Sequence, residues 1–116
     1  MPNNICHIEI PTVDFNVSTG FYREVFGWKI EYIPENDYAV FATGESPGGG
    51  FPKVDKITSG GILIYIMVED IGRMLKKIEK AGGKIITPRT EIPETGWFAI
   101  FSDPEGNFLG LFQTGK

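Results

Sequence analysis

The sequence predicts an α+β fold in which a strand, a helix and three further strands occur twice. Three observations support this prediction: two amphipathic helical segments with similar ends, a series of short strand-like segments, and related residues that recur at nearly constant spacing. The chain has 116 residues, of which 41% are hydrophobic. This length allows one hydrophobic core but is too short for two independent domains. We therefore expect a single domain over residues 1–116, with modules at approximately 1–57 and 58–116.

Each module is predicted to contain one helix that buries a single apolar stripe. In the first, Val17, Phe21 and Val25 recur at helical spacing between Asp14 and Gly27. The apolar positions of the second helix are Ile71, Met74, Leu75 and Ile78, between Asp70 and Gly82-Gly83. An aspartate before a helix can accept hydrogen bonds from the free amides of the first turn, and a glycine suits the left-handed position after the last turn.

Short segments rich in β-branched and aromatic residues, bounded by Gly, Pro, Asn and Asp, are predicted to be strands. The expected strands are Ile5–Ile10, Trp28–Ile33, Tyr38–Thr43, Ile62–Val68, Lys84–Thr87, Trp97–Ser102 and Phe108–Gln113, with a further short strand at Gly48–Phe51. We expect them to form one mixed eight-stranded sheet. The segment Asp103–Asn107 has Pro and Gly where a tight turn needs them, so it should join the last two strands as a hairpin.

The two halves of the sequence align with each other. The matched positions are Asp14 with Asp70 and Gly27 with Gly83, 56 residues apart, and Tyr38 with Phe98 and Gly50 with Gly110, 60 residues apart. The four additional residues are consistent with a longer loop in the second half. A duplicated module explains this regularity, and chance similarity between two ordinary βα units is the alternative.

Composition excludes several classes of partner. Fifteen acidic and eleven basic residues give a net charge of −4, whereas nucleic-acid binding needs a concentrated basic patch. No stretch approaches the roughly 18 consecutive apolar residues of a membrane span, and the N-terminal segment lacks the pattern of a signal peptide. The single Cys6 cannot form an internal disulfide. We therefore expect a cytoplasmic protein with no nucleic-acid or membrane partner.

Several segments together resemble the glyoxalase/bleomycin-resistance/dioxygenase superfamily, also called the vicinal oxygen chelate superfamily. They are His7–Ile10, Phe21–Trp28, Tyr65–Asp70, Ala81–Lys84 and Gly96–Asn107. Their order and spacing carry the resemblance more than any single motif does. The resemblance implies two βαβββ modules whose mixed sheet curls around a cavity, with the helices outside. It also implies a homodimer.

The resemblance further implies four metal-ligand positions, one on each of four cavity-lining strands. In this sequence they fall on His7, Gly50, Leu63 and Gly110. Only His7 has a side chain that coordinates a metal ion. We therefore expect no metal and no other cofactor. A divalent metal held by His7, Glu9 and water molecules is the alternative.

Strand alternation predicts which side chains line the cavity. His7 and Glu9 share one face of the first strand, whereas Cys6 and Ile62 are expected to face the helices. The other residues expected to line the ligand cavity are Gly50, Leu63, Tyr65, Met67, Phe98, Phe108, Gly110 and Phe112. A largely aromatic and apolar lining is typical of small-molecule sites. The alternative is plain packing for Tyr65 and Phe98, and for His7 a partly buried side chain hydrogen-bonded to its neighbours.

Three functions are compatible with these features. The first is the binding of a small apolar or aromatic molecule, as in bleomycin-resistance proteins. The second is a glyoxalase-like lyase or isomerase whose metal site is reduced, relocated or missing, with His7 and Glu9 as candidate catalytic residues and His7 as the base. The third is an accessory domain without a ligand. The sequence alone leaves all three open, and with them the question of whether the protein is an enzyme.

Overall fold

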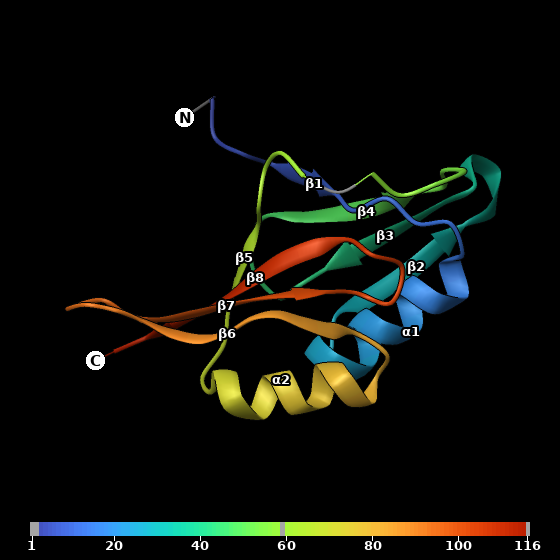
Figure 1. Cartoon of the computed structure of the whole chain (residues 1–116). Helices are drawn as coiled ribbons and strands as arrows, with labels where there is room; N and C mark the ends of the chain where they lie inside the picture. The colour runs from blue at the N-terminus through green and yellow to red at the C-terminus, as the bar shows by residue number, and fades with distance from the viewer. Residues whose placement is uncertain (1–2, 59, 116) are drawn as a thin grey trace. The chain divides into compact units, whose positions relative to one another are not determined.

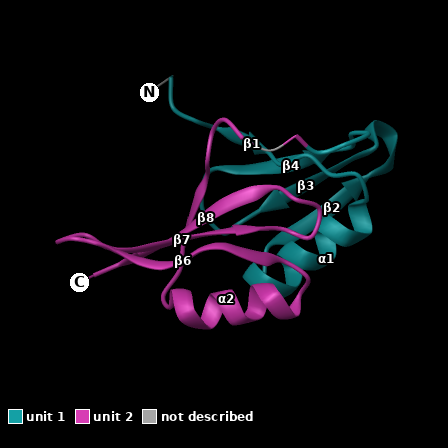
Figure 2. Cartoon of the chain, in the orientation of Figure 1, with its two compact units in different colours: residues 1–57 teal, residues 58–116 magenta. Residues whose placement is uncertain are grey.

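The computed structural model describes residues 3–58 and 60–115. Contacts between Cα atoms divide the chain into two compact units, residues 1–57 and 58–116 (Figure 2). Within the described residues each unit contains four strands and one α-helix, α1 (Phe15–Phe26) in unit 1 and α2 (Ile71–Lys80) in unit 2 (Figure 1). In both units the order is strand, helix, then three strands. The α+β class and the repeated βαβββ modules are therefore confirmed.

The described part of unit 1 forms a mixed four-stranded sheet. Its strands are β1 (His7–Glu9), β2 (Lys29–Ile33), β3 (Tyr38–Ala42) and β4 (Gly48–Pro52), and a short 3₁₀ helix, η1 (Pro34–Asn36), joins β2 to β3. The spatial order is β1-β4-β3-β2, in which β1 and β4 are parallel and the other neighbours antiparallel. The glycine-rich strand β4 thus lies inside the sheet, paired on both sides.

Unit 2 repeats this sheet. Its strands are β5 (Tyr65–Met67), β6 (Lys84–Ile92), β7 (Gly96–Ser102) and β8 (Phe108–Thr114), in the order β5-β8-β7-β6. The pairing also repeats, because Glu9 lies opposite Gly50 in unit 1 and Tyr65 lies opposite Gly110 in unit 2. The described residues thus form two sheets of four strands rather than the single eight-stranded sheet that we expected, since each first strand pairs with the last strand of its own unit.

Both helices begin and end where the sequence predicts. A carboxylate oxygen of Asp14 accepts a hydrogen bond from a first-turn amide of α1 at 2.9 Å, and Asp70 does the same for α2 at 3.1 Å. Gly27 follows α1 with a φ of 70°, and Gly82 follows α2 with a φ of 101°. These left-handed conformations are favourable for glycine, which has no Cβ. Both predicted sets of caps are confirmed.

The core of unit 1 is an aromatic cluster. The fully buried Tyr22 of α1 stacks on Trp28 with ring centroids 4.9 Å apart, and Trp28 stacks on Phe41 at 4.6 Å. Phe41 in turn lies 5.2 Å from Phe51 of β4. Val17, predicted to belong to the buried stripe, is 38% exposed. The buried face of α1 is thus rotated toward Tyr22, because large aromatic rings gain more from burial than Val17 does.

In unit 2, α2 covers one face of the sheet (Figure 1). Ile71 and Ile78 of the helix are fully buried, and Leu109 and Leu111 of β8 are buried as well. The predicted alternation of β8 is confirmed, since its even-numbered aromatic residues are the more exposed ones. The Gln113 side chain of β8 also accepts a hydrogen bond from the Ile71 amide at 2.8 Å, which links the last strand to the start of α2.

The hairpin between β7 and β8 is confirmed as well. Asp103 is only 2% exposed, and one of its carboxylate oxygens accepts hydrogen bonds from the amides of Glu105 and Asn107 at 3.0 and 2.9 Å. The second oxygen accepts from the Asn107 side chain at 3.1 Å. These three hydrogen bonds, all accepted by one buried carboxylate, hold the turn in a single conformation. Separately, within the described residues, no helix is long and apolar enough to cross a membrane.

Two glycines with different surroundings test this account of the fold. In Gly83→Ala the new Cβ would lie 2.6 Å from a methyl carbon of Ile78 and 2.7 Å from the Ser102 carbonyl oxygen, so we expect the free energy of unfolding to fall by about 1–3 kcal/mol. In Gly20→Ala the new Cβ meets no atom within 4 Å. Because alanine favours a helix more than glycine does, the free energy of unfolding should rise by up to about 1 kcal/mol. Urea unfolding measures both changes, and equal responses would contradict the packing described.

Candidate functional site

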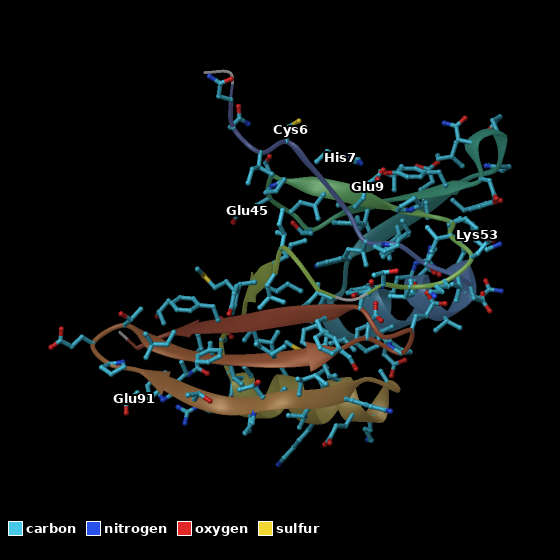
Figure 3. All side chains as sticks on the ribbon, turned by 45° about the horizontal axis from the view of Figure 1, so that its top comes forward. Cys6, His7, Glu9, Glu45, Lys53 and Glu91 are labelled. Atoms are coloured by element: carbon cyan, nitrogen blue, oxygen red, sulfur yellow. The ribbon has the colours of Figure 1, made fainter. Side chains whose placement is uncertain are left out.

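Three polar side chains of unit 1 form a continuous hydrogen-bonded group, which we call the unit 1 triad. The Tyr38 hydroxyl donates to a carboxylate oxygen of Glu9 at 2.8 Å and lies 2.8 Å from Nε2 of His7. The rings of His7 and Tyr38 are nearly parallel, with centroids 6.4 Å apart. Figure 3 labels His7 and Glu9 along the N-terminal strand of unit 1. The structure thus places both on one face of β1 and joins them through a third residue.

The triad depends on a glycine in the strand between its members. Tyr38 belongs to β3, whereas His7 and Glu9 belong to β1, and β4 lies between those two strands. A Cβ atom at Gly50 would collide with the ring and hydroxyl of Tyr38. Because Gly50 has no side chain, Tyr38 can extend across β4 and reach β1. The space that the sequence predicts for a ligand above Gly50 is therefore filled by Tyr38.

The surroundings of Tyr38 keep its hydroxyl protonated. Burial, the hydrogen bond to Glu9 and the negative charge of Glu9 raise the pKa of Tyr38 from 10.0 to about 12, in that order of importance. At neutral pH the hydroxyl is therefore a hydrogen-bond donor toward Glu9. His7 and Glu9, the two candidate catalytic residues, are thus linked through the Tyr38 hydroxyl.

Sequence reasoning missed Tyr38, although a signal for it was present. Tyr38 occupies the repeat position of Phe98, which strand alternation places among the cavity-lining residues. The same assignment applied to the first module would have put Tyr38 on the face of His7 and Glu9. The spatial order of the strands, which brings β3 within reach of β1, is not visible in the local sequence pattern.

Unit 2 contains an apolar pocket of about 400 Å³, lined by Tyr65, Ile92, Phe98 and Phe112. Phe98 and Phe112 lie directly opposite each other on β7 and β8. The structure thus brings together three of the predicted cavity residues. Ile92 was not predicted, because β6 was expected to end at Thr87 and instead continues to Ile92.

The remaining predicted cavity residues of unit 2 lie outside this lining. Met67 and Phe108 are 71% and 43% exposed, and Leu63 is half-buried just before β5. Gly110 lies beneath the ring of Tyr65, where an added Cβ would approach two ring carbons to 2.5 Å. A tyrosine therefore covers the matched glycine in both units. It comes from β3 in unit 1 and from β5 in unit 2.

Two residues that we expected to face the helices do not. Cys6 is exposed, and Ile62 is 91% exposed. The physical reason is the same for both: β1 begins only at His7 and β5 only at Tyr65, so Cys6 and Ile62 precede their strands. Alternation between the two faces of a sheet applies only within a paired strand.

The residues at the four positions that the resemblance assigns to metal ligands do not fit a metal site. In unit 1, Nε2 of His7 is engaged by Tyr38, and the space above Gly50 is filled. In unit 2, Leu63 and Gly110 have no donor atoms in their side chains. Among residues 3–58 and 60–115, no group of three or more His, Cys, Asp or Glu side chains gathers closely enough to hold a metal ion.

Comparison with known proteins assigns the chain to a class. The structure is a duplicated βαβββ domain. In each unit a tyrosine covers a glycine of the last strand. Residues 4–111 match the sequence model of the Glyoxalase/Bleomycin resistance protein/Dioxygenase superfamily. The chain belongs to this superfamily, which confirms the resemblance of the sequence segments.

Individual relatives agree with this assignment. The chain is 33% identical over 115 residues to a glyoxylase-like domain-containing protein of Didymella fabae, covering 89% of this chain and 88% of that protein. It is 22% identical over 125 residues to the anthracycline biosynthesis protein DnrV of Streptomyces peucetius, covering 92% of this chain but 46% of that protein. The chain thus spans about half the length of this longer relative.

Solved structures of the superfamily have the same fold. The fosfomycin resistance protein FosX of Listeria monocytogenes has a TM-score of 0.82 at 16% identity, covering 98% of this chain and 93% of that one. A variant of FosX in complex with Mn(II) also has a TM-score of 0.82, at 15% identity. At such low identity the likeness concerns the fold alone.

The tyrosines provide a test of the triad. In a spectrophotometric pH titration we expect a component near pH 12 that disappears in Tyr38→Phe and moves to lower pH in Glu9→Gln, because an amide lacks the negative charge that opposes ionisation. Since the pKa of Tyr38 is raised on folding, its contribution to stability is complete below pH 10 and is lost as pH rises toward 12. Tyr32→Phe, which removes a different hydroxyl, is the matched control. A component insensitive to Glu9→Gln would contradict the contact.

Proposed function

We propose that the protein binds a small apolar or aromatic molecule in the pocket of unit 2. The observation that carries this proposal is the lining of the pocket, which consists of three aromatic side chains and Ile92 around about 400 Å³. Ligand pockets commonly have volumes of roughly 300–1,000 Å³ and mostly apolar linings. The facing pair Phe98 and Phe112 offers aromatic surfaces on which a flat ring can pack.

The chemistry of the lining also favours one class of ligand over another. None of the four lining side chains carries a positive charge, so an anionic phosphonate such as fosfomycin would lose water without gaining an ion pair. The Tyr65 hydroxyl can form one hydrogen bond with a polar substituent. The relationship to DnrV supports this choice, because anthracyclines are polycyclic aromatic molecules.

We further propose that the protein works without a metal ion or another cofactor. Two of the four ligand positions carry glycine and one carries leucine, and the remaining His7 is held by Tyr38. A single imidazole with an engaged nitrogen cannot replace the several ligands that a divalent ion requires.

We also propose that the protein acts as a homodimer in the cytoplasm. The family resemblance supports the dimer, and the single cysteine, Cys6, which cannot form an internal disulfide, supports a reducing compartment. Sedimentation velocity at several concentrations tests the dimer, and a purely monomeric protein would contradict it.

Binding can be measured with a neutral dihydroxyanthraquinone as the probe. At one hundred times its dissociation constant we expect stabilisation by about 2.7 kcal/mol in thermal unfolding. Phe98→Ala should weaken binding about tenfold in calorimetry, because the aromatic contact and its buried area are lost. Ile86→Ala, on the neighbouring strand β6 and outside the pocket lining, is the matched control. No stabilisation by the probe, or an equal loss in both variants, would refute the proposed site, and fosfomycin should have no effect.

Metal binding can be tested in the unmodified protein and in variants that add a carboxylate ligand. We expect the protein to retain less than one equivalent of Mn, Zn or Ni after incubation with each ion and desalting. Gly50→Glu alone should remain metal-free, because Tyr38 fills the position. The double variant Tyr38→Ala/Gly50→Glu should bind Co(II) with a visible absorption band, since three donors would then share one face of unit 1. Stoichiometric metal in the unmodified protein would show that the proposal is wrong.

A further inference from the structure

The unit 1 triad determines which nitrogen of His7 carries a proton. A carboxylate oxygen of Glu9 has no proton to donate, so the single proton of the Tyr38 hydroxyl points toward Glu9. The Tyr38 oxygen can then only accept a hydrogen bond from His7, which requires a proton on Nε2. A neutral imidazole has one N–H group. Nδ1 is therefore left with a free lone pair, and it is the acceptor atom of the ring.

The surroundings of His7 leave room for a ligand beside this residue. His7 is an exposed residue of β1, and the residue opposite it on β4 is Gly48, which has no side chain to cover the imidazole. The packing of the His7 ring beside the Tyr38 ring, at an interplanar angle of 17°, restricts the direction in which Nδ1 points. Within the described residues, Tyr38 is the hydrogen-bond partner that the structure gives the His7 side chain.

We infer that His7 Nδ1 is the acceptor atom of a second small-molecule site, located on unit 1 and suited to a ligand with an O–H donor such as a phenol. Glu9 polarises the Tyr38 hydroxyl, and Tyr38 polarises the N–H group of His7, so the chain of hydrogen bonds strengthens Nδ1 as an acceptor. Tyr38 and Glu9 are positioning residues, because they act on the ligand through His7. None of these three residues lines the pocket proposed for unit 2, so this inference does not rest on that pocket.

Nuclear magnetic resonance of the imidazole tests this inference directly. The protein contains one histidine, so histidine labelled with nitrogen-15 gives one unambiguous pair of ring signals. In mildly alkaline buffer we expect Nε2 at the shift of a protonated nitrogen and Nδ1 at that of an unprotonated one. Titration with phenol should move the Nδ1 signal more than the Nε2 signal. A protonated Nδ1 in the free protein, or no response to phenol, would overturn the inference.

Two substitutions separate positioning from a merely structural role. Tyr38→Phe removes the acceptor of the Nε2 proton, so the ring should return toward a mixture of tautomers and phenol should bind about tenfold more weakly. Glu9→Gln should have a smaller effect in the same direction. Tyr32→Phe, which removes a hydroxyl bonded to Asp37 in the same unit, should leave the His7 signals unchanged. Circular dichroism checks the fold of each variant, and a folded Tyr38→Phe with unchanged His7 signals would contradict the role of Tyr38.

The His7 signals report on unit 1 alone. If Phe98→Ala leaves dihydroxyanthraquinone binding unchanged while phenol moves Nδ1, the proposal for unit 2 is wrong and the site on unit 1 stands. If Nδ1 does not respond while dihydroxyanthraquinone binding is lost in Phe98→Ala, the reverse holds. The two experiments therefore fail independently.

Discussion

The parallel pairing of each first strand with a glycine of the last strand is the constraint on which both sites depend. Glu9 lies opposite Gly50, and Tyr65 lies opposite Gly110. A glycine in a sheet removes one side chain from the surface and so opens a path along which a long neighbour can lie across the strand. In each unit a tyrosine takes that path, and its ring covers the backbone. The glycines thus decide which side chains can meet.

Duplication has produced two similar frameworks with different chemistry. The repeat pairs Glu9 with Tyr65 and Tyr38 with Phe98. In unit 1 a carboxylate and a hydroxyl bind each other and recruit His7, which gives a polar group on the sheet. In unit 2 the phenylalanine has no hydroxyl to bind, so Tyr65 and Phe98 contribute to an apolar pocket instead. Differences at three matched positions, His7 with Leu63 being the third, thus separate a hydrogen-bonding site from an apolar one.

Much of this organisation follows from local sequence, and the rest depends on long-range pairing. Helix caps such as Asp14 and Asp70 act within one turn, so their positions are visible in the sequence. Strand β6 is different: Pro88 has no amide proton for the ladder and suggests that the strand ends there, yet pairing resumes after register shifts on either side of Thr87. Ile92 entered the pocket lining for that reason. The contact of Tyr38 with His7 was not predicted, because it arises only from the spatial order β1-β4-β3 of the strands.

The raised pKa of Tyr38 bears on which atom of unit 1 can interact with a ligand. The Tyr38 hydroxyl, which ionises only near pH 12, is a hydrogen-bond donor at neutral pH, and its proton is already donated to Glu9. Tyr38 therefore cannot act as a base, and it has no second proton to offer a ligand. Its oxygen instead accepts the hydrogen bond from Nε2–H of His7. Nδ1 of His7 is then the atom that can accept a hydrogen bond from a ligand. The tyrosine that fills the space above Gly50 thus turns a potential metal ligand into an oriented hydrogen-bond acceptor.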